Sequence, residues 1–316
     1  MRKTLTIVAV IIVILVIGGG AAQYLMRTDT GLPGGIGEDP QATEESEATE
    51  AAPETPAQPE WCPAYEFISA PGTWESAPDD DPLNPSANPY SFMLSITNPL
   101  KESFGEDQVR VWTLPYTAQF KSVQSPNEMS YDDSRNEGQA RLEEELRWMH
   151  GECPQTQFIL SGFSQGAVIV GDVADEIGGG TGVIPAESVA GVAVIADGRR
   201  VNGVGINPGN ELGGIGAEIA LQPVTGLVQL VVPGASMRGE RPNDFGSLAD
   251  RTFQICAPSD SICDAPHNIG NAADRALELI DANGIHAMYA SNDEVIPGTT
   301  TNQWVVDWAS GIINQG

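Results

Sequence analysis

The sequence predicts an α/β domain in which a central, mainly parallel sheet of about five strands lies between layers of helices. Two observations predict this fold. From Trp61 onward, short runs of β-branched and aromatic residues alternate with helical patterns. The segment FILSGFSQGAVIV (158–170) also places a Gly-x-Ser-x-Gly turn between one such strand and one such helix.

Five apolar runs are predicted to be buried strands because they are short and rich in residues that favour a pleated, buried backbone. Their alternation with helices favours a parallel sheet that is covered on both faces. The runs are Tyr65–Ser69, Val109–Leu114, Gln157–Ser161, Val189–Ile195 and Arg251–Ile255.

Four helices are predicted between and after these strands. Leu142, Leu146 and Met149 recur on one face of segment 136–150, which stops at Gly151, as expected for an amphipathic helix with a C-terminal glycine. Two glycine-rich segments, 178–182 and 203–216, lack nucleotide-binding patterns and are interpreted as a helix end and a surface insertion. The remaining predicted helices cover residues 165–177, 272–283 and 302–313.

The first residues predict export. Arg2 and Lys3 precede an uncharged run from Thr4 to Met26, which is the order found in a signal peptide or signal anchor. The run is long enough to span a bilayer with its basic end in the cytoplasm. Residues 1–28 are therefore predicted to attach the protein to the cell membrane, with the folded domain outside. Gly20-Ala21-Ala22 resembles a cleavage site, so release as a secreted or cell-wall protein is the alternative.

Residues 29–60 are predicted to be a disordered linker. The segment from Glu38 to Glu60 contains eight acidic residues, four prolines and no basic residue, so it has little apolar surface to bury. The folded domain is expected to cover residues 61–316. The net charge of −28 excludes a nucleic-acid partner, which would require a basic surface.

All four cysteines, Cys62, Cys153, Cys256 and Cys263, lie in the predicted domain. An even number in an exported chain favours two disulfides, and four cysteines allow three pairings. A short Cys256–Cys263 loop is plausible locally, and it would leave Cys62 to pair with Cys153. A metal site is disfavoured because no Cys-x-x-Cys occurs and no histidine has zinc-ligand spacing from these cysteines.

Ser164 stands between Gly162 and Gly166 at the predicted strand-to-helix turn. This is the setting of a nucleophile elbow, in which glycines avoid clashes where the chain doubles back. The helix that follows points its N-terminal amides and its dipole toward the serine oxygen. A serine in an ordinary glycine turn is the alternative, so a base must be found elsewhere in the chain.

The chain has three histidines, His150, His267 and His286. His150 precedes the serine and ends a predicted helix, whereas α/β-hydrolases order their residues as Ser, then Asp or Glu, then His. Position alone leaves His267 and His286 open as the base.

The third member should be a carboxylate that orients the imidazole and stabilises its cation. Asp260 lies inside the expected Cys256–Cys263 loop, where a disulfide would limit its conformational freedom. Asp264 and Asp244 are rivals that lack this constraint.

The combined motifs Cys-Pro…Gly-Phe-Ser-Gln-Gly…Cys-x-x-x-Asp-x-x-Cys…His-x-x-Tyr resemble those of the cutinase family of serine esterases over most of residues 61–316. The resemblance implies a three-layer α/β-hydrolase fold of the cutinase type. It implies Ser164 as the nucleophile, Asp260 as the orienting acid and His286, through the His-x-x-Tyr match, as the base. It also implies the disulfides Cys62–Cys153 and Cys256–Cys263, the pairing favoured above.

The same resemblance implies an oxyanion hole. One donor would be the backbone amide of Gln165, directly after the nucleophile. The second would be Thr73, in the loop after the first strand, through its amide and its hydroxyl. A simple turn residue is the alternative interpretation of Thr73.

The chain departs from small secreted cutinases in its apolar N-terminus, its acidic linker and a long glycine-rich stretch from Arg199 to Asp250. These features look more like the envelope-anchored cutinase-like proteins of mycolic-acid bacteria, which are linked to lipase, phospholipase A and thioesterase activity and to envelope lipid balance. The long stretch is either a lid or acyl groove, or decoration without a role.

The expected function is that of an exported serine carboxylesterase acting on ester, thioester or phospholipid acyl bonds of envelope lipids through an acyl-enzyme. No cofactor and no metal are expected, and the expected partners are lipid or acyl-ester substrates and the cell membrane. An acyltransferase acting on envelope lipids and a non-catalytic lipid-binding domain are the alternatives.

Overall fold

The structure is a computed structural model, and it describes all residues except 1–57, 269, 271, 282–283 and 316. The predicted membrane segment at 1–28 and nearly all of the predicted linker at 29–60 lie outside the described residues. All described residues belong to one compact unit, Glu54–Gly316. Within this described part, no helix is long and apolar enough to cross a membrane.

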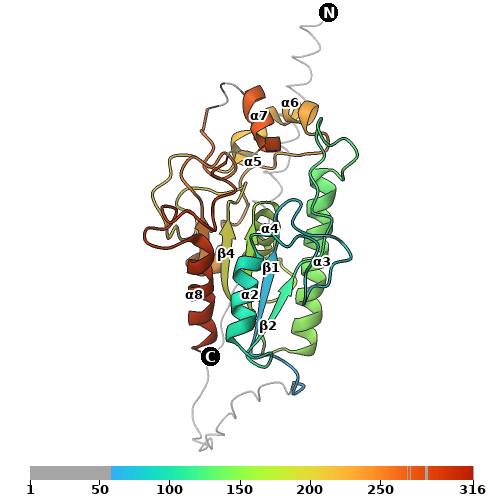
Figure 1. Cartoon of the computed structure of the whole chain (residues 1–316), viewed down its shortest axis with the longest axis vertical. Coiled ribbons are helices and arrows are strands. Elements are labelled where there is room, and N and C mark those ends of the chain that lie inside the picture. The colour runs from blue at the N-terminus through green and yellow to red at the C-terminus, as the bar shows by residue number, and fades with distance from the viewer. Residues whose placement is uncertain (1–57, 269, 271, 282–283, 316) are drawn as a thin grey trace, which may run out of the picture. The chain divides into compact units, whose positions relative to one another are not determined.

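A five-stranded sheet forms the centre of the domain, in the order β2-β1-β3-β4-β5 (Figure 1). All four neighbouring pairs are parallel, so the predicted α/β fold is confirmed. Each predicted strand is present, with ends displaced by two residues at most. The strands are β1 (Tyr65–Ala70), β2 (Val109–Thr113), β3 (Gln157–Phe163), β4 (Val189–Ile195) and β5 (Thr252–Ile255).

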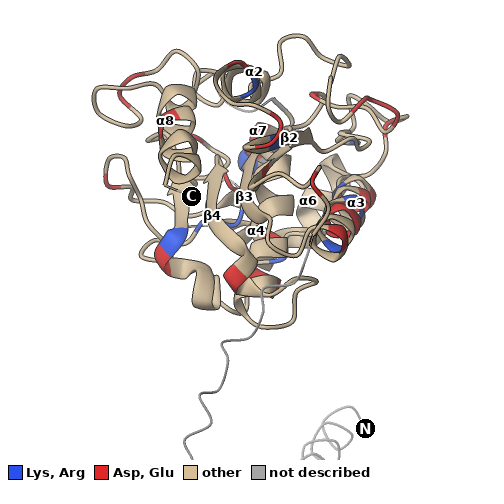
Figure 2. Cartoon of the chain, turned by 90° about the horizontal axis from the view of Figure 1, so that it is seen from below, with Lys and Arg blue, Asp and Glu red and all other residues tan. Residues whose placement is uncertain are grey.

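Helices cover both faces of the sheet (Figure 2). Helices α2 (Leu94–Ser103) and α8 (Thr301–Ile313) pack on one face, and their buried side chains join those of Phe67 and Ile159 in one core cluster. Helices α3 (Tyr131–Glu152) and α4 (Gln165–Gly178) enclose a second cluster on the other face. Both faces of the sheet are therefore buried, which explains why its strands are almost continuously apolar.

Two of the helices that cover the sheet differ clearly from the prediction. Helix α2 was not predicted because Pro99 lies inside it, and proline normally interrupts a helical pattern. Helix α3 begins five residues earlier than expected, at Tyr131 instead of Asn136. The Ser130 side chain accepts the amide of Asp133 at 3.1 Å and caps the helix, so this polar first turn is helical without an apolar periodicity.

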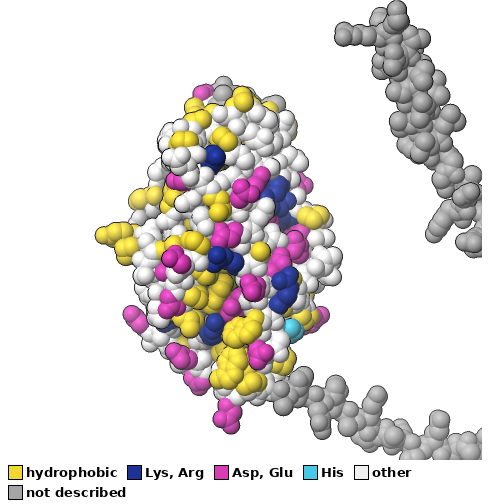
Figure 3. Space-filling model, turned by 90° about the vertical axis from the view of Figure 1, so that its right-hand side faces the viewer, with side chains coloured by type: hydrophobic (Ala, Val, Ile, Leu, Met, Phe, Trp, Pro, Cys, Tyr) yellow, Lys and Arg dark blue, Asp and Glu magenta, His cyan; other side chains and the backbone are white. Residues whose placement is uncertain are grey.

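The outer face of α3 is covered with charges of both signs (Figure 3). Arg141 pairs with Glu137 at 2.8 Å and Arg147 with Glu143 at 2.7 Å, each one helical turn apart. Such exposed pairs stabilise a helix only slightly. On this face, the large acidic excess of the chain is thus partly balanced by basic side chains.

The long stretch between β4 and β5 forms two short helices, α5 (Ala217–Ala220) and α6 (Thr225–Val231). They lie with α7 (Ala272–Asp281) beyond one end of the sheet (Figure 1). Val228, Val232, Met237 and Ile280 pack together in a separate small core. This stretch is therefore partly buried, and the segment 203–216, interpreted above as a surface insertion, is also hydrogen-bonded to β5 through Ile206.

Both expected disulfides are present. Cys62 is bonded to Cys153 and Cys256 to Cys263, with Cα–Cα distances of 5.5 and 5.9 Å, and the described residues include no free cysteine. The first disulfide joins the entrance of the domain to the end of α3, and the second closes a short loop after β5. Disulfides of this kind indicate an extracytoplasmic protein.

Candidate active site

Ser164 lies at the sharp turn between β3 and α4. Its φ and ψ angles are 55° and −117°, a combination that costs energy for a residue with a side chain. A Cβ atom on Gly162 would overlap the carbonyl oxygen of Gly166, and one on Gly166 would overlap that of Ala70. Glycine is required at both positions, so the local sequence produces the strained turn that lifts the serine hydroxyl above the sheet.

A continuous chain of hydrogen bonds joins Ser164, His286 and Asp260. The Nε2 atom of His286 lies 2.9 Å from the Oγ atom of Ser164, and its Nδ1 atom lies 2.9 Å from the Oδ2 atom of Asp260. The three residues come from the β3–α4 turn, the segment between α7 and α8, and the loop after β5. The parallel sheet brings them together because its strands end at the same edge.

The surroundings of Asp260 assign the protons in this chain of hydrogen bonds. Asp260 is completely buried. Its Oδ1 atom accepts the amide of Ile262 at 2.9 Å, and its Oδ2 atom accepts the hydroxyl of Tyr289 at 2.7 Å. Because an ionised carboxylate only accepts, Nδ1 of His286 donates to it, and Nε2 of the neutral imidazole is then free to accept the Ser164 hydroxyl.

The ring of His286 is held from the side by aromatic residues. Phe163 stacks on it with a centroid distance of 5.1 Å and an interplanar angle of 24°, and Tyr289 lies edge-on at 6.3 Å. Among the other histidines, His267 is exposed. His150 lies at the end of α3, 3.5 Å from the Ser188 hydroxyl. The geometry thus distinguishes the two histidines that sequence position had left open.

The rival carboxylates have other places in the structure. Asp264 accepts the amides of Gly214 and Ser259 at 2.6 and 2.7 Å, which fastens the loop after β5 to the long stretch before it. Asp244 occupies a left-handed position, with φ of 50°, in the turn before Phe245. The hydrogen bond of His286 goes to Asp260.

The two residues expected to form an oxyanion hole contact each other directly. The Thr73 hydroxyl donates to the side-chain oxygen of Gln165 at 3.0 Å. The Gln165 side-chain nitrogen in turn donates to the Ser134 hydroxyl on α3 at 2.8 Å. These bonds hold the loop after β1 against the start of α4, next to the serine.

Glu75 is a polar residue of the site that the sequence analysis did not identify. Its carboxylate accepts the amides of Gly72 and Phe92 at 3.0 and 2.9 Å and the hydroxyl of Ser91 at 3.1 Å. Burial raises the pKa of Glu75, although these hydrogen bonds act in the opposite direction. The carboxylate ties the loop that carries Thr73 to the segment before α2, and no motif in the sequence distinguishes it from the many surface acids.

A cavity of about 400 Å³ opens beside Ser164. One side of this cavity is formed by Thr73, Gln165 and His286, together with Ser164. The other walls are mainly apolar and come from α3 and the loop before it, α4, the 199–250 stretch, the loop after β5 and α7. They include Phe120, Tyr131, Val168, Ala217, Met237, Ile262, Leu279 and Ile280.

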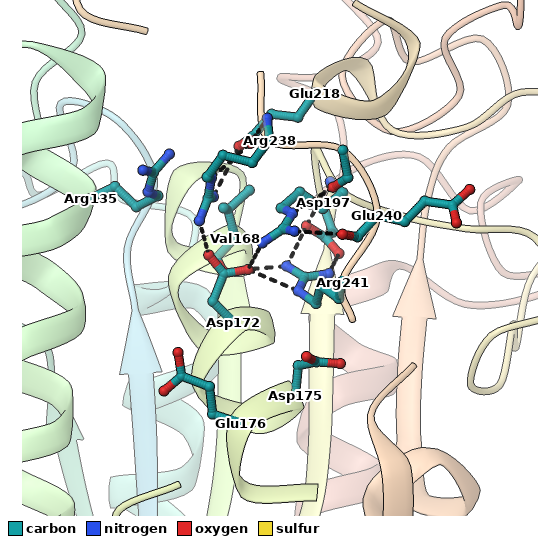
Figure 4. A network of polar contacts seen from close by, with 12 residues as sticks. Arg135, Val168, Asp172, Asp175, Glu176, Asp197, Glu218, Arg238, Glu240 and Arg241 are labelled. Carbon is teal, nitrogen blue, oxygen red and sulfur yellow. Dashed lines mark hydrogen bonds and ion pairs between the residues drawn. The ribbon is translucent and has the colours of Figure 1, made fainter. Parts of the chain in front are cut away.

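A buried ion network fastens the 199–250 stretch to α4, the helix that follows Ser164 (Figure 4). Asp172, two turns after Ser164 on α4, accepts Arg199 at 2.8 Å and Arg241 at 2.9 Å, and it also pairs with Arg238. Burial acts to raise the pKa of Asp172, but the three arginines outweigh it and hold the pKa below its ordinary value.

The network continues to the wall of the cavity. Arg241 forms two bonds to Asp197, at 2.6 and 3.1 Å, and Arg238 binds Glu218 at 3.0 Å. Glu218 also accepts the Tyr131 hydroxyl at 2.6 Å, and both of these residues line the cavity. The stretch from Arg199 to Asp250 is therefore built into the site.

The described residues contain no group of three or more His, Cys, Asp or Glu side chains arranged to hold a metal ion.

Known proteins resemble this chain along most of its length. The sequence model of the cutinase family, described as "Cutinase", matches residues 62–295. The "Carboxylesterase Culp6 homolog" of Corynebacterium glutamicum is 60% identical over 320 residues, covering 100% of both chains. The "Probable carboxylesterase Culp5" of Mycobacterium tuberculosis is 26% identical over 198 residues, covering 60% of this chain and 93% of its own.

A solved structure shares the fold. It is titled "A novel cutinase-like protein from Cryptococcus sp.", and it superposes with a TM-score of 0.50 over 81% of this chain and 98% of its own, at 20% identity. The family match covers most of the described domain, and the relative that is 60% identical spans the whole chain. The chain therefore belongs to the cutinase family.

Proposed function

We propose that this chain, a carboxylic ester hydrolase of the cutinase family, cleaves acyl esters of cell-envelope lipids through an acyl-enzyme formed on Ser164. The observation that carries the proposal is the hydrogen-bonded series Ser164–His286–Asp260 beside a mainly apolar cavity. A serine, a base in contact with it and a buried acid in contact with the base are the groups that acyl transfer requires.

In the first step, the Ser164 oxygen attacks the ester carbonyl while His286 takes the serine proton. Asp260 accepts the Nδ1 hydrogen of His286 and stabilises the imidazolium that forms. Negative charge develops on the carbonyl oxygen, where the amide of Gln165, at the start of α4, and Thr73 act as donors. Because the first amides of a helix have no partner within the helix, they are available for this role.

Collapse of the tetrahedral intermediate breaks the ester bond, and His286 gives its proton to the departing alcohol. Water then attacks the acyl-enzyme with His286 acting as base. The carboxylic acid leaves and Ser164 regains its proton. If an alcohol replaces water in the second step, the same residues perform acyl transfer, which is the alternative reaction.

The cavity supports a lipid acyl chain as the group that is bound. Its walls away from Ser164 are mainly apolar, and such surface is favourable for burying methylene groups. Trp74 and Tyr90 line the cavity and are 52% and 91% exposed, so amphipathic rings lie at its mouth. The relative that is 60% identical carries the name carboxylesterase, which agrees with an ester substrate.

The location is part of the proposal. The uncharged run from Thr4 to Met26 anchors the protein in the cell membrane, and the acidic linker at 29–60 holds the domain 61–316 outside. The two disulfides support an extracytoplasmic site. Fractionation of cells that express the full chain, with and without residues 1–28, tests the anchor: loss of membrane association is expected when they are removed. Membrane association of the shortened chain contradicts the anchor.

The test of the activity is hydrolysis of p-nitrophenyl esters of increasing acyl length by the full-length chain. Ser164→Ala and His286→Ala are expected to abolish hydrolysis, whereas His267→Ala, an exposed histidine, serves as the matched control and retains it. Survival of activity in Ser164→Ala overturns the mechanism. Covalent labelling by a phosphonate without ester hydrolysis, together with transfer of the acyl group to an added alcohol, identifies an acyltransferase instead.

A further inference from the structure

The hydroxyl of Tyr289 is hydrogen-bonded to the acid of the site, while its ring lies edge-on to the base. Its hydroxyl donates to Oδ2 of Asp260 at 2.7 Å, the same oxygen that lies 2.9 Å from Nδ1 of His286. The residue belongs to the His-x-x-Tyr motif, in which the histidine had a predicted role and the tyrosine had none. Its side chain is 1% exposed, so this contact is shielded from water.

The Tyr289 hydroxyl is itself fixed in direction. It accepts the amide of Ala257 at 2.9 Å, at the start of the loop closed by the Cys256–Cys263 disulfide. With that amide on its oxygen, the hydroxyl hydrogen is directed to Asp260. Burial raises the pKa of Tyr289 well above its ordinary value, and the Asp260 carboxylate adds to this, so the hydroxyl remains a donor through the working pH range.

The consequence is a two-point attachment. His286 and Tyr289 lie three residues apart in one short segment, and both bind the same oxygen of Asp260. A single hydrogen bond would leave the carboxylate and the imidazole free to rotate about it. The second bond, with the Ile262 amide on the other carboxylate oxygen, fixes the plane of the carboxylate and the position of the segment that carries the base.

We infer that Tyr289 is a positioning residue for the Ser164–His286–Asp260 series, acting through its hydroxyl on Asp260. This inference rests on the proposed function, and it adds to that function a fourth side chain whose effect appears in the rate of the chemical step and not in substrate binding. The same hydroxyl joins the disulfide loop to the histidine segment, so it links the two parts of the chain that must meet for catalysis.

The test is a double-mutant cycle in the full-length chain with a short, soluble p-nitrophenyl ester. Tyr289→Phe removes only the hydroxyl and is expected to lower kcat roughly 10-fold with KM unchanged, as expected for loss of one hydrogen bond to a charged group. In the Asp260→Asn background, the same substitution is expected to change kcat little further, because its target is already altered.

Tyr116→Phe is the matched control. Tyr116 is equally buried, but its hydroxyl donates to the backbone oxygen of Pro71 at 2.7 Å. The effect of Tyr116→Phe on kcat is expected to be the same with and without Asp260→Asn. The melting temperature of Tyr116→Phe serves as the reference for loss of one buried hydroxyl. An unchanged kcat in Tyr289→Phe, or an equal fold-loss in both backgrounds, overturns the inference.

The outcome for Asp260→Asn alone separates this inference from the proposed function. Full activity in that variant overturns the proposed mechanism, and with it the role of Tyr289. If Asp260→Asn is impaired and Tyr289→Phe is not, only the inference about Tyr289 fails.

A second measurement does not depend on the folding of Tyr289→Phe. With 3-fluorotyrosine at position 289, a more acidic phenol competes more strongly for the Asp260 oxygen. The downfield NMR resonance of the His286 Nδ1 hydrogen is then expected to move upfield, and a resonance that does not move contradicts the inference.

Discussion

The Thr73 hydroxyl and the Gln165 side chain are joined by a hydrogen bond of 3.0 Å, although 92 residues separate them in the sequence. The bond links the loop after β1 to the first residue of α4, the two segments that would surround the oxyanion. In the proposed mechanism Gln165 thus has two functions: its backbone amide donates to the oxyanion, and its side chain holds Thr73, the other proposed donor, in place.

We expect Thr73→Val to lower kcat by roughly 10²-fold, because it removes the hydroxyl while keeping the shape of the side chain. KM should change little, since the single hydroxyl hydrogen, which Gln165 accepts in the free enzyme, turns to the oxyanion only in the transition state. Thr73→Ser keeps the hydroxyl and is the control, expected to stay near the activity of the natural protein. Steady-state kinetics with one soluble ester measure both, and equal activity of the Val and Ser variants contradicts the role of the hydroxyl.

Met237 offers a test of the 199–250 stretch as part of the acyl site. Met237→Ala enlarges the cavity, so the preferred p-nitrophenyl ester should shift toward longer acyl chains. Val232 lies in the same small core but does not line the cavity. Val232→Ala should therefore lower the melting temperature, as any large-to-small core change does, without changing the chain-length preference. If the chain-length preference shifts equally in both variants, the shift comes from a less tightly packed core and not from the shape of the cavity.

The two disulfides are expected to contribute differently to stability and to catalysis. Cys62–Cys153 spans 91 residues and Cys256–Cys263 spans seven. In the chain-entropy description, loss of the first costs about 4–5 kcal/mol and loss of the second about 2–3 kcal/mol. The variant that lacks Cys62–Cys153, with both cysteines changed to Ala, should therefore unfold at a lower denaturant concentration than the variant that lacks Cys256–Cys263.

The two disulfides should rank in the opposite order in their effect on kcat, because the shorter loop holds Asp260. Removing Cys256–Cys263 should lower kcat more than removing Cys62–Cys153 under conditions where both variants are folded. The idea fails if the long-range disulfide has the larger effect on kcat.

Asp172→Asn should destabilise the domain strongly, because three arginines lose a buried partner charge that they share. Breaking a buried pair from one side costs about 3–5 kcal/mol. The matched control is Glu176→Gln, one turn further along α4, whose carboxylate contacts Gln139 at 3.2 Å. Urea denaturation at neutral pH measures both variants, and similar midpoints would show that the network contributes little to stability.

The contribution of Asp172 should also depend on pH. Its pKa is lower in the folded protein than in the unfolded chain, so its stabilising effect is complete above the unfolded value of about 3.9. The effect is lost as the pH falls through the folded value. The stability difference between the natural protein and Asp172→Asn should therefore narrow below about pH 4, and a constant difference down to pH 3 would contradict this.

Much of the fold could be predicted because local patterns carry it. The five strands are short apolar runs, and the turn at Ser164 requires glycine on either side, so both leave marks in a single sequence. Two features could not be predicted from local patterns. Helix α2 contains Pro99 and is stabilised by packing, and the polar first turn of α3 is stabilised by the cap at Ser130.

The candidate site was predictable to a different degree. Ser164 and Asp260 lie in local motifs, but choosing His286 over His267 depended on the family resemblance. Glu75 resembles any surface acid in the sequence, and its burial and three hydrogen bonds appear only in the folded chain. The arginine network around Asp172 was not predictable either, because its members are separated by up to 69 residues.

The sequence by itself determined the class of fold and the strained turn at Ser164, because each depends on neighbouring residues, and the family resemblance of its motifs implied the candidate acid and the pairs of cysteines. Only the tertiary structure decided which hydroxyl, carboxylate and arginine meet around them. Tyr289 reaches Asp260, Thr73 reaches Gln165, and the 199–250 stretch becomes a wall of the cavity. The physical reason is that hydrogen bonds and ion pairs act over a few ångströms in space, and distance along the chain does not specify those contacts.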